Sequence, residues 1–251
     1  MNILICTQII DKTDSALGFF HKWVLLISEK YKNTNVICLK EGAHALPLNF
    51  FVHSLGKESA NGGKLLKRII YIFRFYRLAW KLRREYDIVF VHMNQEYILL
   101  GGIFWMMMGK KIFMWRNHYS GSFLTDIAAS MCDKVFCTSK FSYTAKYKKT
   151  VIMPVGVDVD SCRMDEPVAR LPKSILFLGR LDESKRPHVL IDALGLLFSQ
   201  GIKFSATFAG GPSKEASDYP NKLLAQVESV KISDRVKFVG AVPNTETFRY
   251  Y

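Results

Sequence analysis

The residues best suited to bind an anion lie in one short segment, Ser174–Pro187 (SILFLGRLDESKRP). An apolar run typical of a buried strand ends in a glycine, and Arg180 and Lys185 follow on the way to a helix that begins near Pro187. Ligands of open α/β sheets lie beyond the carboxyl ends of the strands, where helix N-termini attract phosphate, so the two cations could clamp a diphosphate. A solvated basic loop without a ligand would have the same composition, so the neighbouring segments of the sequence must distinguish the two interpretations.

Two further strand ends downstream have glycine where a ligand would lie. The segment Phe204–Pro212 (FSATFAGGP) places Gly211 in a Gly-Gly-Pro turn, at which the backbone can approach a ligand closely. The segment Asp234–Pro243 (DRVKFVGAVP) is a third apolar strand that ends in glycine, with Val242 just beyond it. All three segments therefore indicate a ligand site at the ends of parallel strands.

Two histidines follow strands in the first half of the chain. His118 lies in WRNHYS, after the expected strand 111–115, and His92 ends the expected strand 88–92. Strand ends face the ligand side of such a sheet, which makes both histidines candidates for contact with a substrate. A capping or core role is the alternative for each.

The elements that must position these residues alternate between short β-rich segments and longer helical patterns, which predicts a parallel sheet with crossover helices. Strands are expected at 3–7, 36–40, 88–92, 111–115, 134–137 and 151–153, and helices at 17–30, 64–86, 98–108 and 122–129. We expect these elements to form one α/β domain, residues 1–157.

A charged stretch with two prolines, residues 158–173, interrupts this periodicity and predicts a linker. Beyond it, strands are expected at 174–178, 204–208 and 235–239, and helices at 187–200 and 219–230. A doubly wound domain usually has five or six strands. Residues 174–251 are therefore expected to be the first half of a second domain, with the chain ending inside it.

The order GRLDESKRPHVLIDAL, FAGGP, DRVKFVGAVPN resembles the C-terminal domain of family 4 of the retaining glycosyltransferases, whose fold is called GT-B. The first half is similar: TQIIDKTDSALGFFHKW places Gly18 at the turn into the first helix, where family members often have two glycines. His118 matches the active-site histidine of the family. The segment VIMPVGVD resembles the Pro-Asn-Gly-Val-Asp that closes the first domain, with Val155 in place of Asn.

The resemblance implies two Rossmann-like domains, the second incomplete here, with the nucleotide-sugar donor held mainly by the second and a glycan or lipid-linked acceptor by the first. Transfer with retention would follow. Arg180 and Lys185 would stabilise the charge of the leaving diphosphate in place of a metal, so neither metal nor cofactor is expected. The expected site residues are His118 and His92 as catalytic candidates, with Arg180, Lys185, Gly18, Gly211 and Val242 for the donor.

Family members have a Glu, seven residues, Glu motif after the last motif seen here. Glu215, Glu228 and Glu246 do not have that spacing or context. We therefore expect a C-terminally truncated piece, inactive alone, of an enzyme of cell-surface glycan or glycolipid synthesis. The alternative from another class is a nucleotide- or anion-binding Rossmann module without transfer activity.

The formal net charge of +13 favours partners with phosphates, which include nucleotides, anionic lipids and nucleic acid. Residues 64–84 contain no acidic residue: their cations recur along one side, while Leu65, Ile69, Ile72, Tyr76 and Trp80 line another. Such a helix can lie in an anionic membrane interface and would suit a lipid-linked acceptor. The alternative is a crossover helix with its apolar side on the sheet and its cations in water.

Several other classes are disfavoured. There is no nucleic-acid recognition motif, and no Gly-x-Gly-x-x-Gly follows the first strand as in a dehydrogenase. Asp158 and Asp160 have no further acidic partner for a metal. The five cysteines form no Cys-x-x-Cys pair, and neither a signal peptide nor a spanning segment is evident. We expect a cytoplasmic protein, with peripheral attachment to the inner face of the membrane as an option.

Overall fold

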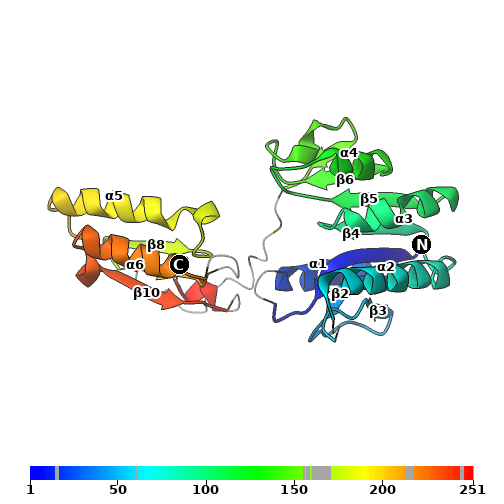
Figure 1. The fold of residues 1–251 in the computed structure, drawn as a ribbon, viewed down its shortest axis with the longest axis horizontal. Coiled ribbons are helices and arrows are strands. Elements are labelled where there is room, and N and C mark those ends of the chain that lie inside the picture. The colour runs from blue at the N-terminus through cyan, green and yellow to red at the C-terminus, as the bar shows by residue number, and fades with distance from the viewer. Residues whose placement is uncertain are drawn as a thin grey trace. The chain divides into compact units, whose positions relative to one another are not determined.

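The protein forms two compact units, Met1–Gly156 and Val157–Tyr251. The computed structural model describes residues 1–14, 17–59, 62–154, 156, 159, 171–212, 217–243 and 246–250. Figure 1 shows the elements of both units. Most of the expected linker, with Asp158 and Asp160, lies outside the described residues. The expected roles of the two domains stay predictions.

The first unit is built on a parallel seven-stranded sheet with the order β3-β2-β1-β4-β5-β6-β7. The strands are β1 Ile3–Ile10, β2 Thr34–Glu41, β3 Phe50–Ser54, β4 Ile88–His92, β5 Lys111–Trp115, β6 Lys134–Cys137 and β7 Thr150–Ile152. The helices are α1 Gly18–Ser28, α2 Lys64–Lys81, α3 Glu96–Met107 and α4 Phe123–Ser130, with a short 3₁₀ helix η1 at Tyr143–Lys146.

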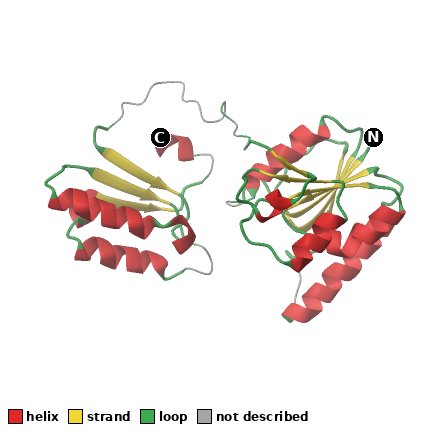
Figure 2. Ribbon diagram, turned by 90° about the horizontal axis from the view of Figure 1, so that it is seen from above, coloured by secondary structure: helices red, strands yellow, loops and turns green. Residues whose placement is uncertain are grey.

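Helices cover both faces of this sheet (Figure 2) because successive side chains of a strand point to opposite faces. On one face, Leu4 of β1 belongs to the core cluster that contains Phe75 of α2 and Trp105 of α3. On the other, Ile5 belongs to a separate cluster with Phe20 of α1. Both helix-covered faces are apolar, which is why the buried strands read as continuous Val, Ile and Leu runs.

The second unit has a parallel sheet with the order β10-β9-β8 and two α-helices. Its elements are β8 Ser174–Leu178, η3 Glu183–Lys185, α5 Pro187–Ser199, β9 Ser205–Ala209, α6 Tyr219–Ser229, η4 Ser233–Arg235, β10 Val236–Gly240 and η5 Thr247–Tyr250. Both α-helices lie on one face of the sheet (Figure 2). The core cluster there joins Ile191 of α5 and Leu223 of α6 to Phe208 of β9.

The α/β fold with parallel sheets is as predicted, and β4, β5, β6 and β8 begin and end at the expected residues. The strand β3 was not expected. It pairs with β2 alone, at the edge of the sheet, and Phe51 is 48% exposed. An edge strand with one neighbour lacks the long apolar run of a central strand, so its pattern is weak. Helix α2 ends at Lys81 and not at Tyr86.

Candidate ligand site at the strand ends

The carboxyl ends of the three strands in the second unit are held together by backbone hydrogen bonds. Leu181 N–H donates to Gly211 O (2.9 Å) and Gly179 N–H to Ala209 O (2.9 Å), which joins the ends of β8 and β9. Gly210 N–H donates to Gly240 O (2.8 Å), which joins β9 to β10. The loops that leave these strands therefore start from one fixed row of strand ends, which we call the strand-end edge of the sheet, or simply its edge.

Gly210 is the glycine that this edge requires. A Cβ on Gly210 would lie 1.8 Å from Gly179 O, and its φ of +151° is one that side chains rarely allow. At Gly211, the residue expected from the sequence, the nearest neighbour of a Cβ would be Ala241 Cβ at 3.2 Å. The Gly-Gly pair marks the end of the strand, but the sequence could not tell which glycine meets the neighbouring strand, and contact of Gly211 with a donor stays a prediction.

Arg180 leaves the end of β8 and is oriented by Asp182. The Arg180 Nε lies 3.3 Å from Asp182 Oδ2, and the Arg180 side chain is 60% exposed whereas that of Asp182 is 10% exposed. Burial would raise the pKa of Asp182, but the Ser184 hydroxyl that donates to it and the charge of Arg180 outweigh burial and lower the pKa. The ionised Asp182 thus holds an exposed guanidinium in place.

Lys185 lies on the same loop, at the end of η3. Asp182 caps this short helix, because its side chain accepts from Lys185 N–H (3.3 Å). The Lys185 side chain is exposed, and among the described residues it pairs with no carboxylate. Arg186 follows in the left-handed region (φ +54°), and Pro187 opens α5 at its first turn. One oriented and one unpaired cation therefore precede the N-terminus of α5.

Asp182 was not among the expected site residues. Its signal is an aspartate directly before a short helical turn, the position of an N-cap. Val242, which was expected to touch the donor, is half-buried after β10. No described contact distinguishes Val242 from its neighbours, so its role stays a prediction.

His118 lies in the first unit, on the loop that follows β5, and is exposed. Its main chain is fixed, since its carbonyl accepts from Tyr143 N–H (2.9 Å) and from Ser142 Oγ (3.2 Å). Ser120 N–H donates to His118 Nδ1 (3.1 Å). Nδ1 of His118 also lies near Ser120 Oγ (2.8 Å) and Ser120 O (3.2 Å), so Ser120 holds this side of the ring, while Nε2 has no hydrogen-bond partner among the described residues.

His92 does not lie in an open site. It is 1% exposed, its ring stacks on Phe20 with centroids 3.7 Å apart, and Nδ1 lies 3.2 Å from Thr7 Oγ1. Burial lowers the pKa of His92 to about 3, and its Nε2 has no hydrogen-bond partner among the described residues. A buried, neutral ring cannot touch an acceptor, so the expected catalytic contact is not supported and the geometry favours the core alternative.

Gly18, the other expected donor contact, is the first residue of α1. Its N–H donates to Asp14 O (2.9 Å), and a Cβ would lie 3.0 Å from Lys12 O. The turn after β1 is thus tight at Gly18, as a glycine at the start of the first helix suggests. Contact with a donor is untested.

The two units place the candidate residues at corresponding positions. Gly18 and His118 follow strands of the first sheet, and Arg180, Lys185 and Gly211 follow strands of the second. In the part of the chain that the structure describes, no three His, Cys, Asp or Glu side chains come together as a metal site would need. The groups that the β8–α5 loop offers to an anion are the exposed Arg180, Lys185 and Arg186, of which Arg180 and Lys185 were expected from the sequence, together with the fixed backbone beside them.

The comparisons with known proteins concern the sequence family and the fold. Residues 163–251 match the sequence model of the family described as glycosyl transferases group 1. A D-inositol 3-phosphate glycosyltransferase of Frankia alni is 27% identical over 121 residues, which are 43% of this chain and 30% of that protein. The chain thus spans less than a third of this relative.

Solved structures show the fold over nearly the whole chain. HepE of Anabaena, solved with UDP, matches 96% of this chain and 70% of its own with a TM-score of 0.70 at 18% identity. Sucrose-phosphate synthase of Thermosynechococcus elongatus matches 99% of this chain and 73% of its own with a TM-score of 0.67 at 15% identity. The chain therefore has the α/β fold of the GT-B glycosyltransferases, as the motifs predicted.

Proposed function

We propose that this protein serves in glycosyl transfer, with the second unit holding a nucleoside-diphosphate sugar through Arg180 and Lys185. The observation that carries the proposal is the loop from β8 to α5. An arginine oriented by an ionised Asp182 and an unpaired lysine precede a helix N-terminus there, inside the part of the chain that matches glycosyl transferases group 1. HepE, which has the same fold, was solved with UDP and with UDP-glucose.

The proposed chemistry follows from where charge develops. When the bond from the anomeric carbon to the diphosphate breaks, negative charge grows on the phosphate oxygens. Because Asp182 contacts the Nε of Arg180, the two Nη groups stay available for those oxygens, in the planar arrangement that suits phosphate. Lys185 adds a point charge. Fixed cations stabilise the leaving group without a metal, and the new bond would form with retention.

The acceptor would be bound by the first unit, where the exposed His118 has an Nε2 without a hydrogen-bond partner among the described residues. We assign it contact with the transferred sugar or with the acceptor, a glycan or lipid-linked molecule of cell-surface glycan or glycolipid synthesis. Its fixed main chain supports this role, since a positioned side chain needs an immobile base. The alternative function is a nucleotide- or anion-binding module without transfer activity.

Titration of the chain with UDP and with GDP, by calorimetry, tests the donor site. A charge-assisted contact contributes about 1.5–3 kcal/mol, so Arg180→Ala or Lys185→Ala should weaken binding roughly tenfold to a hundredfold. The double variant should show no binding. Lys203→Ala is the matched control, because this exposed lysine precedes β9 at the opposite end of the sheet.

Binding should persist with a chelator. Unchanged affinity in the double variant, or a strict need for magnesium, would overturn the donor site. The binding module is distinguished by its products: it would bind UDP but would release no glycoside from any nucleotide sugar in the presence of acceptors. Where a product forms, NMR of the new anomeric proton tests retention.

A further inference from the structure

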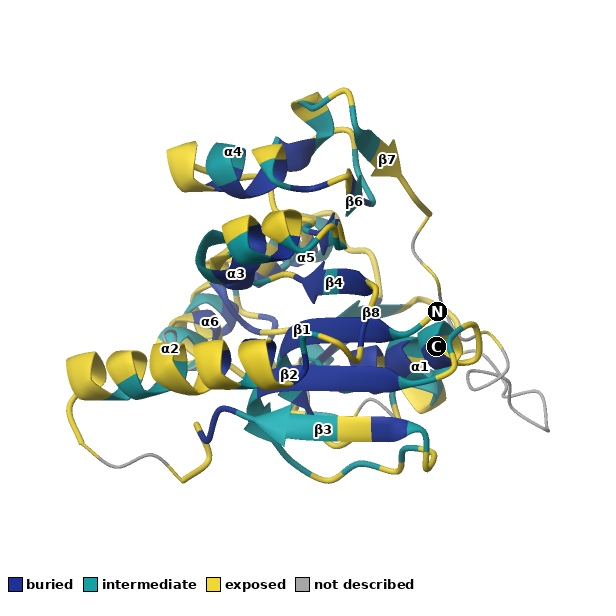
Figure 3. Ribbon diagram, turned by 90° about the vertical axis from the view of Figure 1, so that its right-hand side faces the viewer, coloured by how far each residue is buried: buried dark blue, intermediate teal, exposed yellow. Residues whose placement is uncertain are grey.

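Helix α2 presents more large apolar side chains to solvent than to the core. Only Phe75 and Ala79 of this helix are buried among its described residues. Phe73 is 70% exposed, Leu65 73% and Trp80 60%. Figure 3 shows most of α2 coloured as exposed. An outward face of this kind on a helix is a departure from the usual apolar-in arrangement.

The exposed side chains form a stripe. Leu65, Ile69, Ile72, Tyr76 and Trp80 recur every three or four residues and are all exposed. Residues with this spacing lie on one side of an α-helix. Phe75 and Ala79, four residues apart, form a separate stripe that faces the sheet. The crossover-helix alternative placed the first stripe on the sheet, and the structure places it outward.

Helix α3 extends this surface. The Tyr76 hydroxyl donates to Leu100 O (2.9 Å), and the rings of Trp80 and Phe104 lie 6.0 Å apart, so the two helices are neighbours along the stripe. On α3, Ile103 is 67% exposed and Met107 84%. We call the following residues the α2–α3 patch: Leu65, Ile69, Ile72, Phe73, Tyr76 and Trp80 of α2, with Ile103 and Met107 of α3.

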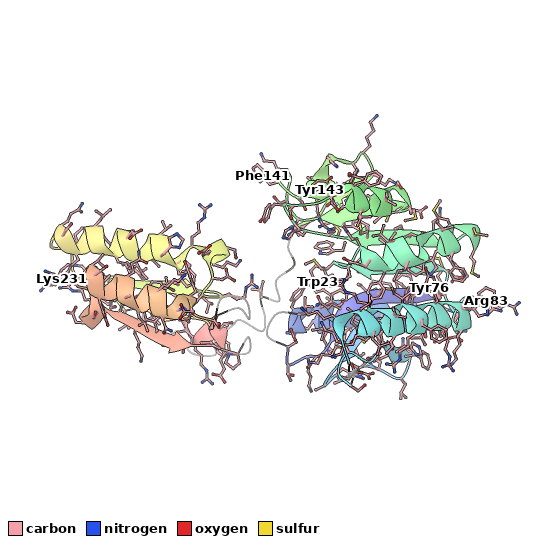
Figure 4. All side chains as sticks on the ribbon, in the orientation of Figure 1. Trp23, Tyr76, Arg83, Phe141, Tyr143 and Lys231 are labelled. Carbon is pink, nitrogen blue, oxygen red and sulfur yellow. The ribbon has the colours of Figure 1, made fainter. Side chains whose placement is uncertain are left out.

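Cations border the α2–α3 patch. The segment from Lys64 to Arg84 has no acidic residue. Arg77, Lys81 and Arg84 are exposed and pair with no carboxylate among the described residues. Arg83 lies over the Trp80 ring, 4.3 Å from its centroid, and Figure 4 shows Arg83 reaching outward beyond the end of α2. The patch is therefore apolar at its centre and positively charged at its edge.

We propose that the α2–α3 patch docks on the surface of an anionic lipid bilayer. The aromatic and aliphatic side chains would enter the boundary between headgroups and acyl chains, and Arg77, Lys81 and Arg84 would contact lipid phosphates. An anionic bilayer is favoured because its negative lipid phosphates complement the cations at the edge of the patch. A second copy of the chain on the same patch would bring like cations together, which opposes a symmetric dimer. The inference does not rest on the donor site, which lies in the other unit.

Sedimentation of the full chain with vesicles tests the proposal. Vesicles of phosphatidylcholine with phosphatidylglycerol should bind the protein, and vesicles of phosphatidylcholine alone should bind it at least tenfold more weakly. Raising the salt from about 0.1 M to about 1 M shortens the reach of charges from about 10 Å to about 3 Å and should release it. Each cation near the surface contributes about 1 kcal/mol, so Arg77→Gln with Lys81→Gln should weaken binding roughly 25-fold.

The apolar half of the patch has its own variant and control. Phe73→Ser with Trp80→Ser should weaken vesicle binding more than tenfold. Val189→Ser with Leu196→Ser is the matched control, because these residues are 51% and 65% exposed on α5 of the second unit. This control pair should bind vesicles like the unchanged protein. Circular dichroism checks that each variant is folded.

Trp80 also supplies a spectroscopic signal. It is exposed, whereas Trp105 and Trp115 are buried and Trp23 is half-buried against Trp115, so lipid contact should shift the fluorescence of Trp80 to shorter wavelength and brominated acyl chains should quench it. Trp80→Phe should keep the binding and lose the shift. Equal binding to neutral and anionic vesicles would overturn the proposal. So would self-association in ultracentrifugation that the patch variants abolish, with no vesicle binding, because the patch would then join copies of the chain.

Discussion

The strand-end edges of the two units are built in different ways. In the second unit, backbone groups bond directly to one another around Gly210, and the side chains that leave the edge are charged and exposed. In the first unit, backbone bonds also join the strand ends, as from Met93 N–H to Trp115 O (2.7 Å) and from Arg116 N–H to Phe136 O (3.0 Å), but side chains add to them: Thr144 Oγ1 donates to Arg116 O, and His92 is buried at the end of β4. The second edge therefore leaves its charged side chains free for a ligand, whereas the first edge uses some of its polar side chains to fix its own loops.

The largest effect should come from adding one methyl group to the second edge. Gly210→Ala would place Cβ 1.8 Å from Gly179 O, so the ends of β8 and β9 must separate. We expect a loss of about 3 kcal/mol in the free energy of unfolding of this unit, since neither the space nor φ suits a side chain. Urea unfolding measures it, and hydrogen exchange at β8 and β9 locates it.

Gly211→Ala is the control, because its Cβ would be 3.2 Å from another Cβ and a small shift relieves the contact. It should cost about 1 kcal/mol or less. Equal losses for the two variants would show that the edge is not held as described, and the contrast with the first unit would fail.

The same residues show what the sequence could and could not predict. Arg180 and Lys185 were predicted because an apolar strand followed by glycine and cations is a local pattern. The roles of Gly210 and Asp182 depend on partners across space: Gly179 O on a neighbouring strand, and a guanidinium that turns back to a carboxylate. Local patterns predict elements and their ends, whereas contacts between elements require the packed chain.

The two histidines and α2 make the same point. The sequence placed His92 and His118 after neighbouring strands, and nothing local indicates that α1 brings Phe20 onto one of them. Periodicity likewise showed that α2 is amphipathic. It could not show that the stripe with Phe75 meets the sheet while the stripe with Trp80 faces outward, because both have helical spacing.

The buried histidine predicts a pH dependence of stability in the first unit. Burial lowers the pKa of His92 to about 3, while the unfolded chain has the ordinary value of 6.5. Between these values the unfolded state binds a proton that the folded state does not, so stability falls as the pH falls below 6.5. We expect a contribution of about 2 kcal/mol to be lost between pH 7.5 and pH 5.

Urea unfolding across this range, followed by the intrinsic tryptophan fluorescence, measures the loss; all four tryptophans lie in the first unit. His92→Phe should make the profile less steep, because the ring can still stack on Phe20 but cannot take up a proton; His21 and His53, whose pKa values burial also lowers, keep the remaining slope. His118→Ala is the control: the residue is exposed, so the profile should stay as steep as in the unchanged protein. A profile of unchanged slope in His92→Phe would place the titration elsewhere.

The smallest effect should come from one hydroxyl of the first edge. Thr144 is fully buried and its Oγ1 donates to Arg116 O (2.9 Å), which helps to fix the loop that presents His118. Thr144→Val keeps the shape and removes the donor, and the Ser142 hydroxyl, which lies 3.4 Å from Arg116 O and 3.2 Å from His118 O, can turn its single hydrogen toward Arg116 O. We therefore expect a loss of only about 1 kcal/mol in the free energy of unfolding.

Thr138→Val is the matched control, because the Thr138 hydroxyl makes no hydrogen bond among the described residues and its removal should change stability little. Hydrogen exchange of the amide of Tyr143, which donates to His118 O, reports on the loop itself and should speed up in Thr144→Val alone. If Thr144→Val instead cost as much as Gly210→Ala, the first edge would be no more tolerant of substitution than the second, and the contrast between the two edges would not stand.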